Sequence, residues 1–373
     1  MNLSVGIVGL PNVGKSTLFN ALLKKQQALI ANYPFATIEP NIGIVPVPDE
    51  RLVKLQEIIR ASTPGVEPPI KQATVEFVDI AGLVKGASEG AGLGNKFLSH
   101  IREVSIIAHV VRGFVDENII KEGSIDPLSD YQTINTELML ADLSTVEKIV
   151  SAKGKGQANA RTTAAEKLLK GLGNGKPARD IQLTAEEQVA ARELFLLSAK
   201  PEIIVLNVSE EDYTKEKIPQ IIQKYSELLV TASEARQSAN DNIVVICAKI
   251  EAELAELSEE EQKQYLKDLG LEQSGLERLI QKAYETLGLI SFLTAGEKEV
   301  RAWTIQKGQK APDAAGTIHT DFSKKFIKAE VVSFSSFTEV GGWKKARELG
   351  KAKMEGRDYT MQDGDVVEFK IGN

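Results

Sequence analysis

GLPNVGKST at residues 9–17 fits the pattern G-x-x-x-x-G-K-S/T of a phosphate-binding P-loop. We expect Gly9 and Gly14 to adopt positive φ and to let the backbone approach a ligand, because glycine has no Cβ. The successive N–H groups then form an anion-binding nest at the start of a helix, whose dipole also favours negative charge. Lys15 is expected to reach the β- and γ-phosphates, and the Ser16 hydroxyl is expected to bind Mg²⁺.

The sequence on either side of this loop supplies the strand and the helix that a P-loop requires. Residues 3–8 form an apolar run that predicts a buried strand, and residues 16–23 carry apolar side chains at helical spacing. We therefore predict an α/β P-loop NTPase fold at the start of the chain.

The composition indicates a soluble globular protein of two or three domains, with 373 residues of which 42% are hydrophobic and 26% charged. The net charge of -7 argues against binding along nucleic acid by bulk electrostatics, although a local basic face is compatible with it. The single cysteine, Cys247, excludes an intramolecular disulfide and fits a reducing compartment. Neither a signal peptide nor an apolar run of about 20 residues is visible, so we expect a cytoplasmic protein without a membrane partner.

Two further segments carry residues that close over a bound phosphate in switch proteins. Thr37 lies in a Pro-interrupted loop, where P-loop switch proteins place a threonine on Mg²⁺ and the γ-phosphate. A predicted strand at 73–78 leads into Asp79, which is expected to hold the Mg²⁺ shell, and the Gly82 N–H is expected to sense the γ-phosphate. Leu83 stands where Ras-type enzymes carry a water-orienting glutamine, so hydrolysis should be slow or should use another group.

A polar segment after a predicted strand at 203–206 has the position of a base-reading loop. GTPases carry Asn-Lys-x-Asp there; the aspartate accepts hydrogen bonds from guanine, and the lysine stem packs along the base. In this chain Val208 replaces the lysine and Glu210 replaces the aspartate. Asn207 can still hydrogen-bond an adenine edge, so the segment favours adenine over guanine.

The last base-contacting loop is predicted after the strand at 243–246, where backbone or stem atoms of Ala248 and Lys249 would lie against the base. Ser-Ala-Lys at 198–200 resembles such a loop by its letters. It precedes the strand at 203–206 instead of following it, so we reject it on chain order.

The pattern of apolar residues changes twice outside these motifs. Residues 130–199 carry apolar positions at helical spacing, which predicts a helical hairpin inserted into the nucleotide domain as an interaction arm. From residue 290 onward short β-like runs predict a separate α+β domain. Its interleaved basic and aromatic residues are compatible with RNA binding and equally with a plain solvated face; they are Arg301, Trp303, Lys324, Lys325, Phe326 and Lys328.

These motifs together resemble the YchF or Obg-like ATPases among the P-loop GTPases. The resemblance covers nearly the whole chain and rests on GLPNVGKST at 9–17, NYPFATIEPN at 32–41, DIAGLVKGAS at 79–88, GLGNKFL at 92–98, NVSE at 207–210, RAWTI at 301–305, AAGTIHTDF at 314–322 and DYTMQDGDVV at 358–367. It implies an Obg-type nucleotide domain at 1–280, interrupted by a helical coiled-coil arm at 130–199, and a β-grasp TGS domain at 286–371. It also implies ATP preferred over GTP, and association with the ribosome and with nucleic acid.

The resemblance also implies roles for individual residues. Ser16, Thr37 and Asp79 would bind Mg²⁺, Lys15, Thr37 and Gly82 would act in hydrolysis, and Asn12 is compatible with assistance by K⁺. A histidine proposed to assist hydrolysis in some members aligns with Lys121 here. The nucleotide would contact Asn12, Val13, Gly14, Lys15, Ser16, Thr17, Asn207, Val208, Glu210, Ala248 and Lys249.

The sequence thus predicts a slow ATPase that acts as a molecular switch on the ribosome or RNA and regulates translation or a stress response. Two alternatives stay open at this point. One is a GTPase of the same fold, and the other is a nucleic-acid-binding module in which the nucleotide only stabilises the structure.

Overall fold

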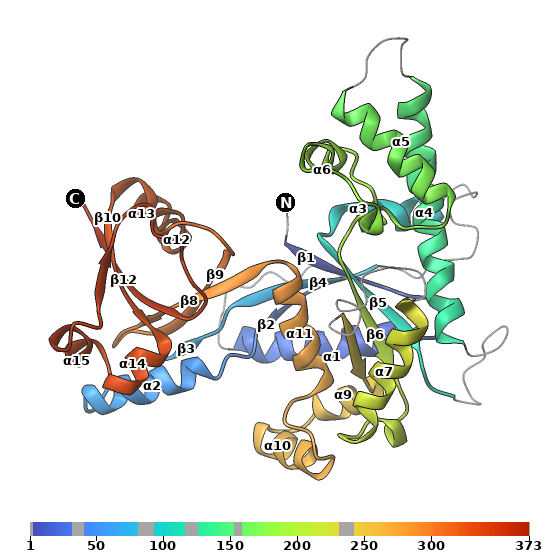
Figure 1. The fold of residues 1–373 in the computed structure, drawn as a ribbon. Helices are drawn as coiled ribbons and strands as arrows, with labels where there is room; N and C mark the ends of the chain where they lie inside the picture. The colour runs from blue at the N-terminus through green and yellow to red at the C-terminus, as the bar shows by residue number, and fades with distance from the viewer. Residues whose placement is uncertain are drawn as a thin grey trace. The chain divides into compact units, whose positions relative to one another are not determined.

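The computed structural model describes residues 3–31, 41–80, 93–115, 126–152, 159–230 and 242–372. The chain forms two compact units, each built from two separate stretches of sequence. The first unit comprises Met1–Val45 and Glu76–Ala283, and the second comprises Pro46–Val75 and Tyr284–Asn373. Figure 1 labels the helices and strands of both units.

The first unit is built on a six-stranded sheet with the strand order β2-β4-β1-β5-β6-β7. β1 pairs in parallel with β4 and β5, and β6 pairs in parallel with β5 and β7. Every residue of β1, β5 and β7 is buried, because helices cover both faces of a parallel sheet. The strands are β1 (Ser4–Val8), β2 (Ile42–Pro46), β4 (Thr74–Asp79), β5 (Ile106–Arg112), β6 (Glu202–Asn207) and β7 (Ile243–Ile246).

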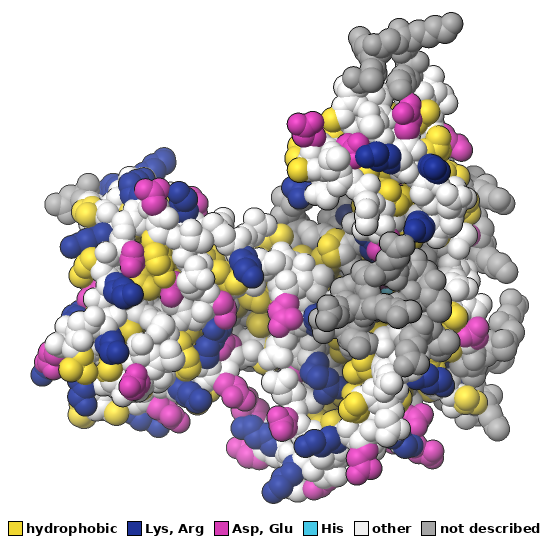
Figure 2. Space-filling view, in the orientation of Figure 1, with side chains coloured by type: hydrophobic (Ala, Val, Ile, Leu, Met, Phe, Trp, Pro, Cys, Tyr) yellow, Lys and Arg dark blue, Asp and Glu magenta, His cyan; other side chains and the backbone are white. Residues whose placement is uncertain are grey.

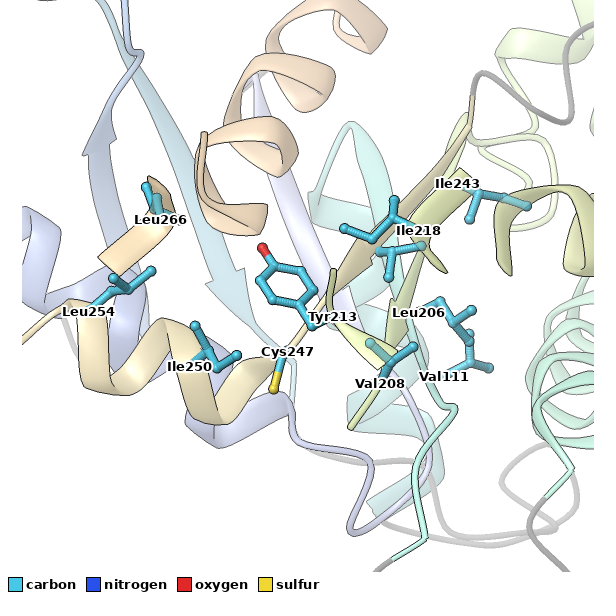
Figure 3. Packing of buried hydrophobic residues seen from close by; sticks show 11 residues of the cluster. Val111, Leu206, Val208, Tyr213, Ile218, Ile243, Cys247, Ile250, Leu254 and Leu266 are labelled. Carbon is cyan, nitrogen blue, oxygen red and sulfur yellow. The ribbon is translucent and has the colours of Figure 1, made fainter. Parts of the chain in front are cut away.

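Helices of this unit pack on the sheet and on one another. The first of them begins at the predicted P-loop and extends to Ala31, a full eight residues beyond the predicted end at residue 23. A cluster of apolar side chains lies between β5, β6, β7 and the helices α7 and α9, beneath the carboxyl ends of the strands (Figure 3). The helices are α1 (Lys15–Ala31), α3 (Leu93–Glu103), α7 (Lys217–Val230), α9 (Ala248–Leu254), α10 (Glu259–Asp268) and α11 (Gly275–Thr286).

The segment predicted as a helical insertion contains α4 (Pro127–Ser151), α5 (Ala160–Gly173) and α6 (Ala185–Arg192). α4 and α5 lie side by side and extend away from the sheet of the same unit (Figure 1). A capping box at Thr184 begins α6: the Thr184 hydroxyl accepts the Glu187 N–H, and the Glu187 side chain accepts the Thr184 N–H. Apolar residues of the three helices form their own small core, so this helical arm is internally packed.

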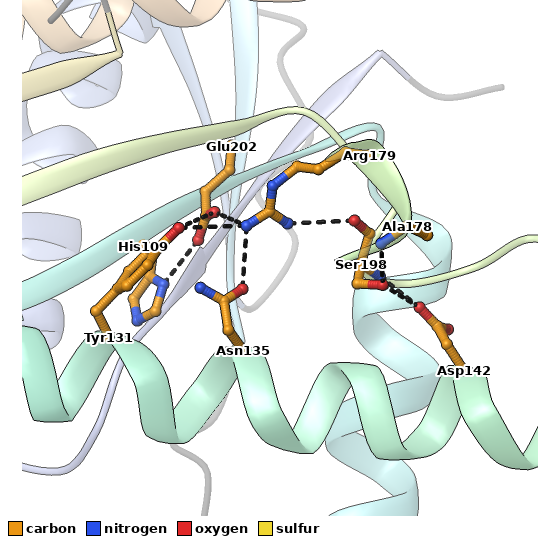
Figure 4. Close-up of polar contacts among 8 residues, drawn as sticks. All are labelled: His109, Tyr131, Asn135, Asp142, Ala178, Arg179, Ser198 and Glu202. Atoms are coloured by element: carbon orange, nitrogen blue, oxygen red, sulfur yellow. Dashed lines mark hydrogen bonds and ion pairs between the residues drawn. The ribbon is translucent and has the colours of Figure 1, made fainter. Parts of the chain in front are cut away.

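The root of the arm is joined to the sheet by a buried polar network (Figure 4). The Glu202 carboxylate, at the start of β6, forms an ion pair with Arg179, accepts the Tyr131 hydroxyl at 3.1 Å, and lies 2.8 Å from His109 Nδ1. Arg179 also donates to Asn135 at 3.1 Å. Burial by itself raises the pKa of Glu202, but the charge of Arg179 and the hydrogen bond of His109 lower it to about 2. Glu202 is therefore ionised in the interior.

A second cluster continues this network along α4. The Asp142 carboxylate accepts the backbone N–H groups of Leu197 and Ser198, both at 2.7 Å, and the Ser198 hydroxyl at 2.6 Å. The same hydroxyl accepts the Ala178 N–H at 3.0 Å. Ser198, in the Ser-Ala-Lys segment rejected as a base loop, therefore belongs to the arm root, and His109 has a structural role in the same network.

The second unit contains a six-stranded mixed sheet with the order β11-β10-β12-β8-β9-β3. Helices α12 (Ala311–Ile318) and α13 (Thr320–Lys325) contribute to a core with Phe292, Phe326 and Val367. The strands are β3 (Ile70–Lys71), β8 (Leu289–Ala295), β9 (Val300–Gln306), β10 (Phe326–Ser333), β11 (Lys353–Glu355) and β12 (Asp365–Ile371), and the other helices are α2 (Arg51–Ser62), α14 (Phe334–Val340) and α15 (Trp343–Glu348).

The predicted domain boundary, which placed residues 46–75 inside the nucleotide domain at 1–280, differs from the structure. They belong to the second unit, where α2 packs against β8, β9 and α14, and β3 pairs with β9. Arg51 donates to Asp49 at 2.7 Å and to Asp363 at 2.8 Å, which fixes the start of α2 beside the turn before β12. A two-residue strand carries no periodicity, so the sequence gives no sign of this pairing.

Candidate nucleotide-binding site

The carboxyl ends of the first unit's parallel strands border a cavity of about 770 Å³. This is the edge at which ligands bind in open α/β sheets. The P-loop follows β1, and the predicted base loops follow β6 and β7, which are neighbours in the sheet. The predicted residues that line the cavity are Asn12, Gly14, Lys15, Ser16, Thr17, Asn207, Val208, Glu210, Ala248 and Lys249.

The P-loop backbone departs from the expectation at one of its two glycines. Gly14 has φ 98° and Asn12 has φ 63°, so an asparagine shares the left-handed conformation that was expected of Gly9. Gly9 is required for a different reason: a Cβ there would lie 2.6 Å from the Val110 carbonyl oxygen. A Cβ on Gly14 would overlap the side-chain amide of Asn207. Both glycines therefore allow close approach of neighbouring strands and loops.

Asn207 joins the P-loop to the last base loop. Its side-chain amide donates to the Val13 carbonyl at 2.9 Å, and its amide oxygen accepts the Ala248 N–H at 2.9 Å. Only 4% of Asn207 is exposed. The side chain thus positions the two loops, and its predicted contact with an adenine edge stays a prediction. Val13 contributes its carbonyl to this joint, while its own side chain is buried.

Lys15 is almost completely buried at the start of α1, and its ammonium donates to the Leu10 carbonyl at 2.7 Å. Burial lowers the pKa of Lys15 to about 8, and the nearby Asp79 carboxylate offsets part of this effect. Burial likewise raises the pKa of Asp79, against the opposing charge of Lys15. The structure therefore brings the predicted phosphate-binding lysine and a predicted Mg²⁺ ligand into the same electrostatic environment.

The two predicted base-reading side chains differ in their surroundings. The Val208 side chain is 4% exposed and packs in the apolar cluster with Leu206 and Tyr213 (Figure 3). Glu210 is half-exposed and forms an ion pair with Lys249, which lies in the first turn of α9. The hydrogen bond and charge of Glu210 raise the pKa of Lys249. The cavity therefore presents a paired carboxylate at its rim.

Four positions with predicted roles lie outside the described residues. They are Thr37, Gly82, Leu83 and Lys121. Their predicted roles in closing over Mg²⁺ and the γ-phosphate, or in assisting hydrolysis, stay predictions.

Phe114 also lines the cavity, and sequence reasoning did not identify it. It follows β5, whose last residue Arg112 donates to the Phe114 carbonyl at 3.1 Å and places its guanidinium 4.6 Å from the ring centroid. The Gly113 N–H donates to the Asn207 carbonyl at 2.8 Å, which fixes this segment beside the base loop. Since β5 lies between β1 and β6, its carboxyl end must border the same cavity, and strand order could have predicted this.

Comparison with known proteins extends from single domains to the whole chain. A family model described as "50S ribosome-binding GTPase" matches residues 4–147, and the YchF-GTPase_C model, described as "Protein of unknown function", matches residues 289–372. The chain is 48% identical to the "Ribosome-binding ATPase YchF" of Bacillus subtilis, over 100% of both chains. It is 48% identical to the protein of the same name in Escherichia coli O157:H7, over 99% of both.

The chain belongs to the YchF family. A solved structure in this family, the Schizosaccharomyces pombe YchF GTPase, superimposes with a TM-score of 0.84 at 37% identity and covers 99% of this chain and 98% of its own. YchF membership confirms the family resemblance and the fold class predicted from the sequence. Within the described ranges, no helix combines the length and the apolar character needed to cross a membrane.

Proposed function

We propose that this member of the YchF family binds ATP with Mg²⁺ in the 770 Å³ cavity, hydrolyses it slowly, and acts as a switch on the ribosome. The observation that carries the proposal is the joint made by Asn207, which ties the P-loop to the base loop around one cavity. Relatives from Bacillus subtilis and Escherichia coli are named ribosome-binding ATPases, which supports the same activity here. A ribosome-bound switch would work in the cytoplasm.

The phosphates would lie against the start of α1, where the first N–H groups of a helix have no intrahelical partner. Lys15 would contribute the positive charge, and the backbone of residues 12–17 would supply the anion-binding groups. Ser16 and Asp79 offer hard oxygen donors, the ligand type that Mg²⁺ prefers. Thr37 and Gly82 would complete the Mg²⁺ and γ-phosphate contacts, a role that rests on their motifs. Asn12 would help to hold K⁺ if a monovalent cation assists.

The base would lie between Phe114 and the segments at 207–210 and 248–249. Val208 is committed to the apolar cluster, so no lysine stem lies along the base as it does in Asn-Lys-x-Asp loops. Glu210 is longer than the aspartate of those loops and is held by Lys249. These differences support adenine as the preferred base.

The predicted RNA-binding surface of the second unit loses part of its support. Phe326 is 4% exposed and lies in the core, and Trp303 packs against the same core with Arg301 over its ring at 3.7 Å. Neither aromatic ring is free to act as a base-stacking platform. Lys324, Lys325 and Lys328 remain exposed, and basic and acidic side chains are mixed over the visible face of this unit (Figure 2). RNA contact through this unit is therefore proposed only as phosphate binding by lysines.

Calorimetric titration of the protein with ATP and with GTP in Mg²⁺, followed by ribosome sedimentation, tests the proposal. ATP should bind more tightly than GTP, and the fraction of protein that sediments with ribosomes should differ between a non-hydrolysable ATP analogue and ADP. Preference for GTP would make the chain a GTPase of the same fold. Ribosome or RNA binding that is identical in every nucleotide state would instead make it a binding module with a structural nucleotide.

ATP affinity should decrease as the pH rises above about 8. Burial lowers the pKa of Lys15 to about 8 in the free protein, and phosphate binding requires the protonated ammonium. Above that pKa each binding event must take up a proton, so the dissociation constant should rise up to about tenfold per pH unit. Titrations at pH 7, 8 and 9 measure this slope. Lys249→Met should keep the slope, because Glu210 raises the pKa of Lys249 and that charge does not titrate in this range.

A further inference from the structure

Three contacts join the two base loops, and they differ in exposure. The Val208 N–H donates to the Ile246 carbonyl at 2.8 Å, and the Ala248 N–H donates to the Asn207 side chain at 2.9 Å. Both contacts lie beneath the cavity and are buried. The third is the ion pair between Lys249 and Glu210 at the cavity rim, where 69% of the lysine side chain and 47% of the glutamate side chain are exposed.

The Lys249 ammonium contacts Oε1 of the Glu210 carboxylate, so this carboxylate already has a donor before a nucleotide arrives. Guanine offers two donors on one edge, its N1–H and its exocyclic amine, and a carboxylate receives them with both oxygens. Adenine offers only its exocyclic amine on the corresponding edge, and its N1 is an acceptor. A carboxylate with one occupied oxygen therefore suits adenine better than guanine.

We propose that Lys249 is a specificity-determining residue, which disfavours guanine by holding one oxygen of Glu210. The inference rests on the proposed function, because it assumes that the base lies at this rim. In this arrangement discrimination comes from a carboxylate that is occupied before the nucleotide arrives. Guanine must displace the lysine to gain its second hydrogen bond, whereas adenine binds with the ion pair intact.

The size of the effect is limited by the strength of the ion pair that guanine must break. An exposed pair shifts an equilibrium by no more than about fivefold, since solvent screens the two charges. Lys249 is therefore expected to supply up to about fivefold of the preference for ATP over GTP. Any larger preference must come from the packing of the base against the buried loops.

Lys249→Met removes the charge and keeps most of the stem, at an exposed position that should not disturb folding. We expect GTP affinity to rise by up to about fivefold, and the ratio of the GTP to the ATP dissociation constant to fall by the same factor. Lys249→Arg, which can keep the ion pair, should retain the wild-type ratio. The matched control is Lys24→Met, because Lys24 also forms an ion pair across this rim, with Glu256 on the segment after α9. It should leave the ratio unchanged.

Calorimetric titrations of the four proteins with ATP and GTP give these ratios. The inference would be overturned if Lys249→Met left the ratio of the GTP to the ATP dissociation constant unchanged, including the case in which both affinities change by the same factor. It would also be overturned if Lys24→Met lowered this ratio as much as Lys249→Met does. The proposed function fails separately, if the wild-type protein binds no ATP or prefers GTP. Wild-type preference for ATP with no shift in Lys249→Met would reject the role of Lys249 alone.

Discussion

Replacing Lys15 with methionine should weaken ATP binding by at least about a hundredfold and leave the protein folded. The lysine ammonium would form charge-assisted hydrogen bonds with two phosphates, each worth about 1.5–3 kcal/mol, and 1.4 kcal/mol corresponds to a factor of ten. No other cation of the described residues follows the P-loop glycines so closely: Lys24 is nine positions further along α1. Titration with ATP in Mg²⁺ measures the loss.

The same variant should not lower the melting temperature in the absence of nucleotide. Burial lowers the pKa of Lys15, which means that the charged ammonium is less stable in the folded protein than in the unfolded chain. An apolar side chain of similar length removes this cost in folding free energy. The control is Lys24→Met, which removes an exposed charge from the same helix and should leave ATP affinity within about twofold. ATP binding that survives in Lys15→Met within about fivefold would place the phosphates elsewhere.

The contrast between local and long-range features explains how much of this fold the sequence could predict. The P-loop and the strands β1, β6 and β7 are encoded within windows of a few residues, and each lies where it was predicted. The strand at β8 was not predicted, and α2 was assigned to the wrong unit. β8 pairs with β12, through Leu293 and Val366, and α2 packs against β8 and β9, so both are placed by partners that lie far along the chain.

The candidate site shows the same limit at the level of single side chains. The motif at 207–210 predicted which residues line the cavity, and strand order explains why they do. Neither of them predicts how the side chains are oriented. The Asn207 side-chain amide hydrogen-bonds Val13 and Ala248 because the P-loop lies close to the end of β7. Val208 likewise turns to the apolar cluster because its neighbours there come from β5 and from the segment after β6. Such choices are made by three-dimensional packing and leave no mark in local spacing.

Arg179→Met should destabilise the protein by about 3–5 kcal/mol at neutral pH, the cost of leaving a buried charge without its partner. Glu202 is the charge at risk, since its side chain is 5% exposed and Arg179 is its main cationic partner. Urea denaturation measured by circular dichroism gives the free energy of unfolding. The change also removes the bonds to Asn135 and to the Ser198 carbonyl, so the arm root should unfold with the sheet.

The dependence of the unfolding free energy on pH should also change in Arg179→Met. In the wild-type protein the pKa of Glu202 is about 2 when folded against an ordinary value of 4.5, so this group's contribution is present above pH 4.5 and is lost as the pH falls toward 2. Without Arg179, burial would raise the folded pKa above the unfolded one, so this loss on acidification should disappear. The double variant Arg179→Met with Glu202→Leu removes both charges, and it should recover most of the stability lost in the single variant.

The arm root matters because β6 connects it to the nucleotide cavity. Glu202 begins the strand and Asn207 ends it, so one continuous element holds the arm network at one end and the loop joint at the other. A loss smaller than about 1 kcal/mol in Arg179→Met would mean that the network does not hold the arm. A loss of the expected size, with ATP affinity unchanged in the folded fraction, would show that the network fixes the arm without shaping the cavity. In that case any nucleotide-dependent movement of the arm must arise from elements other than β6.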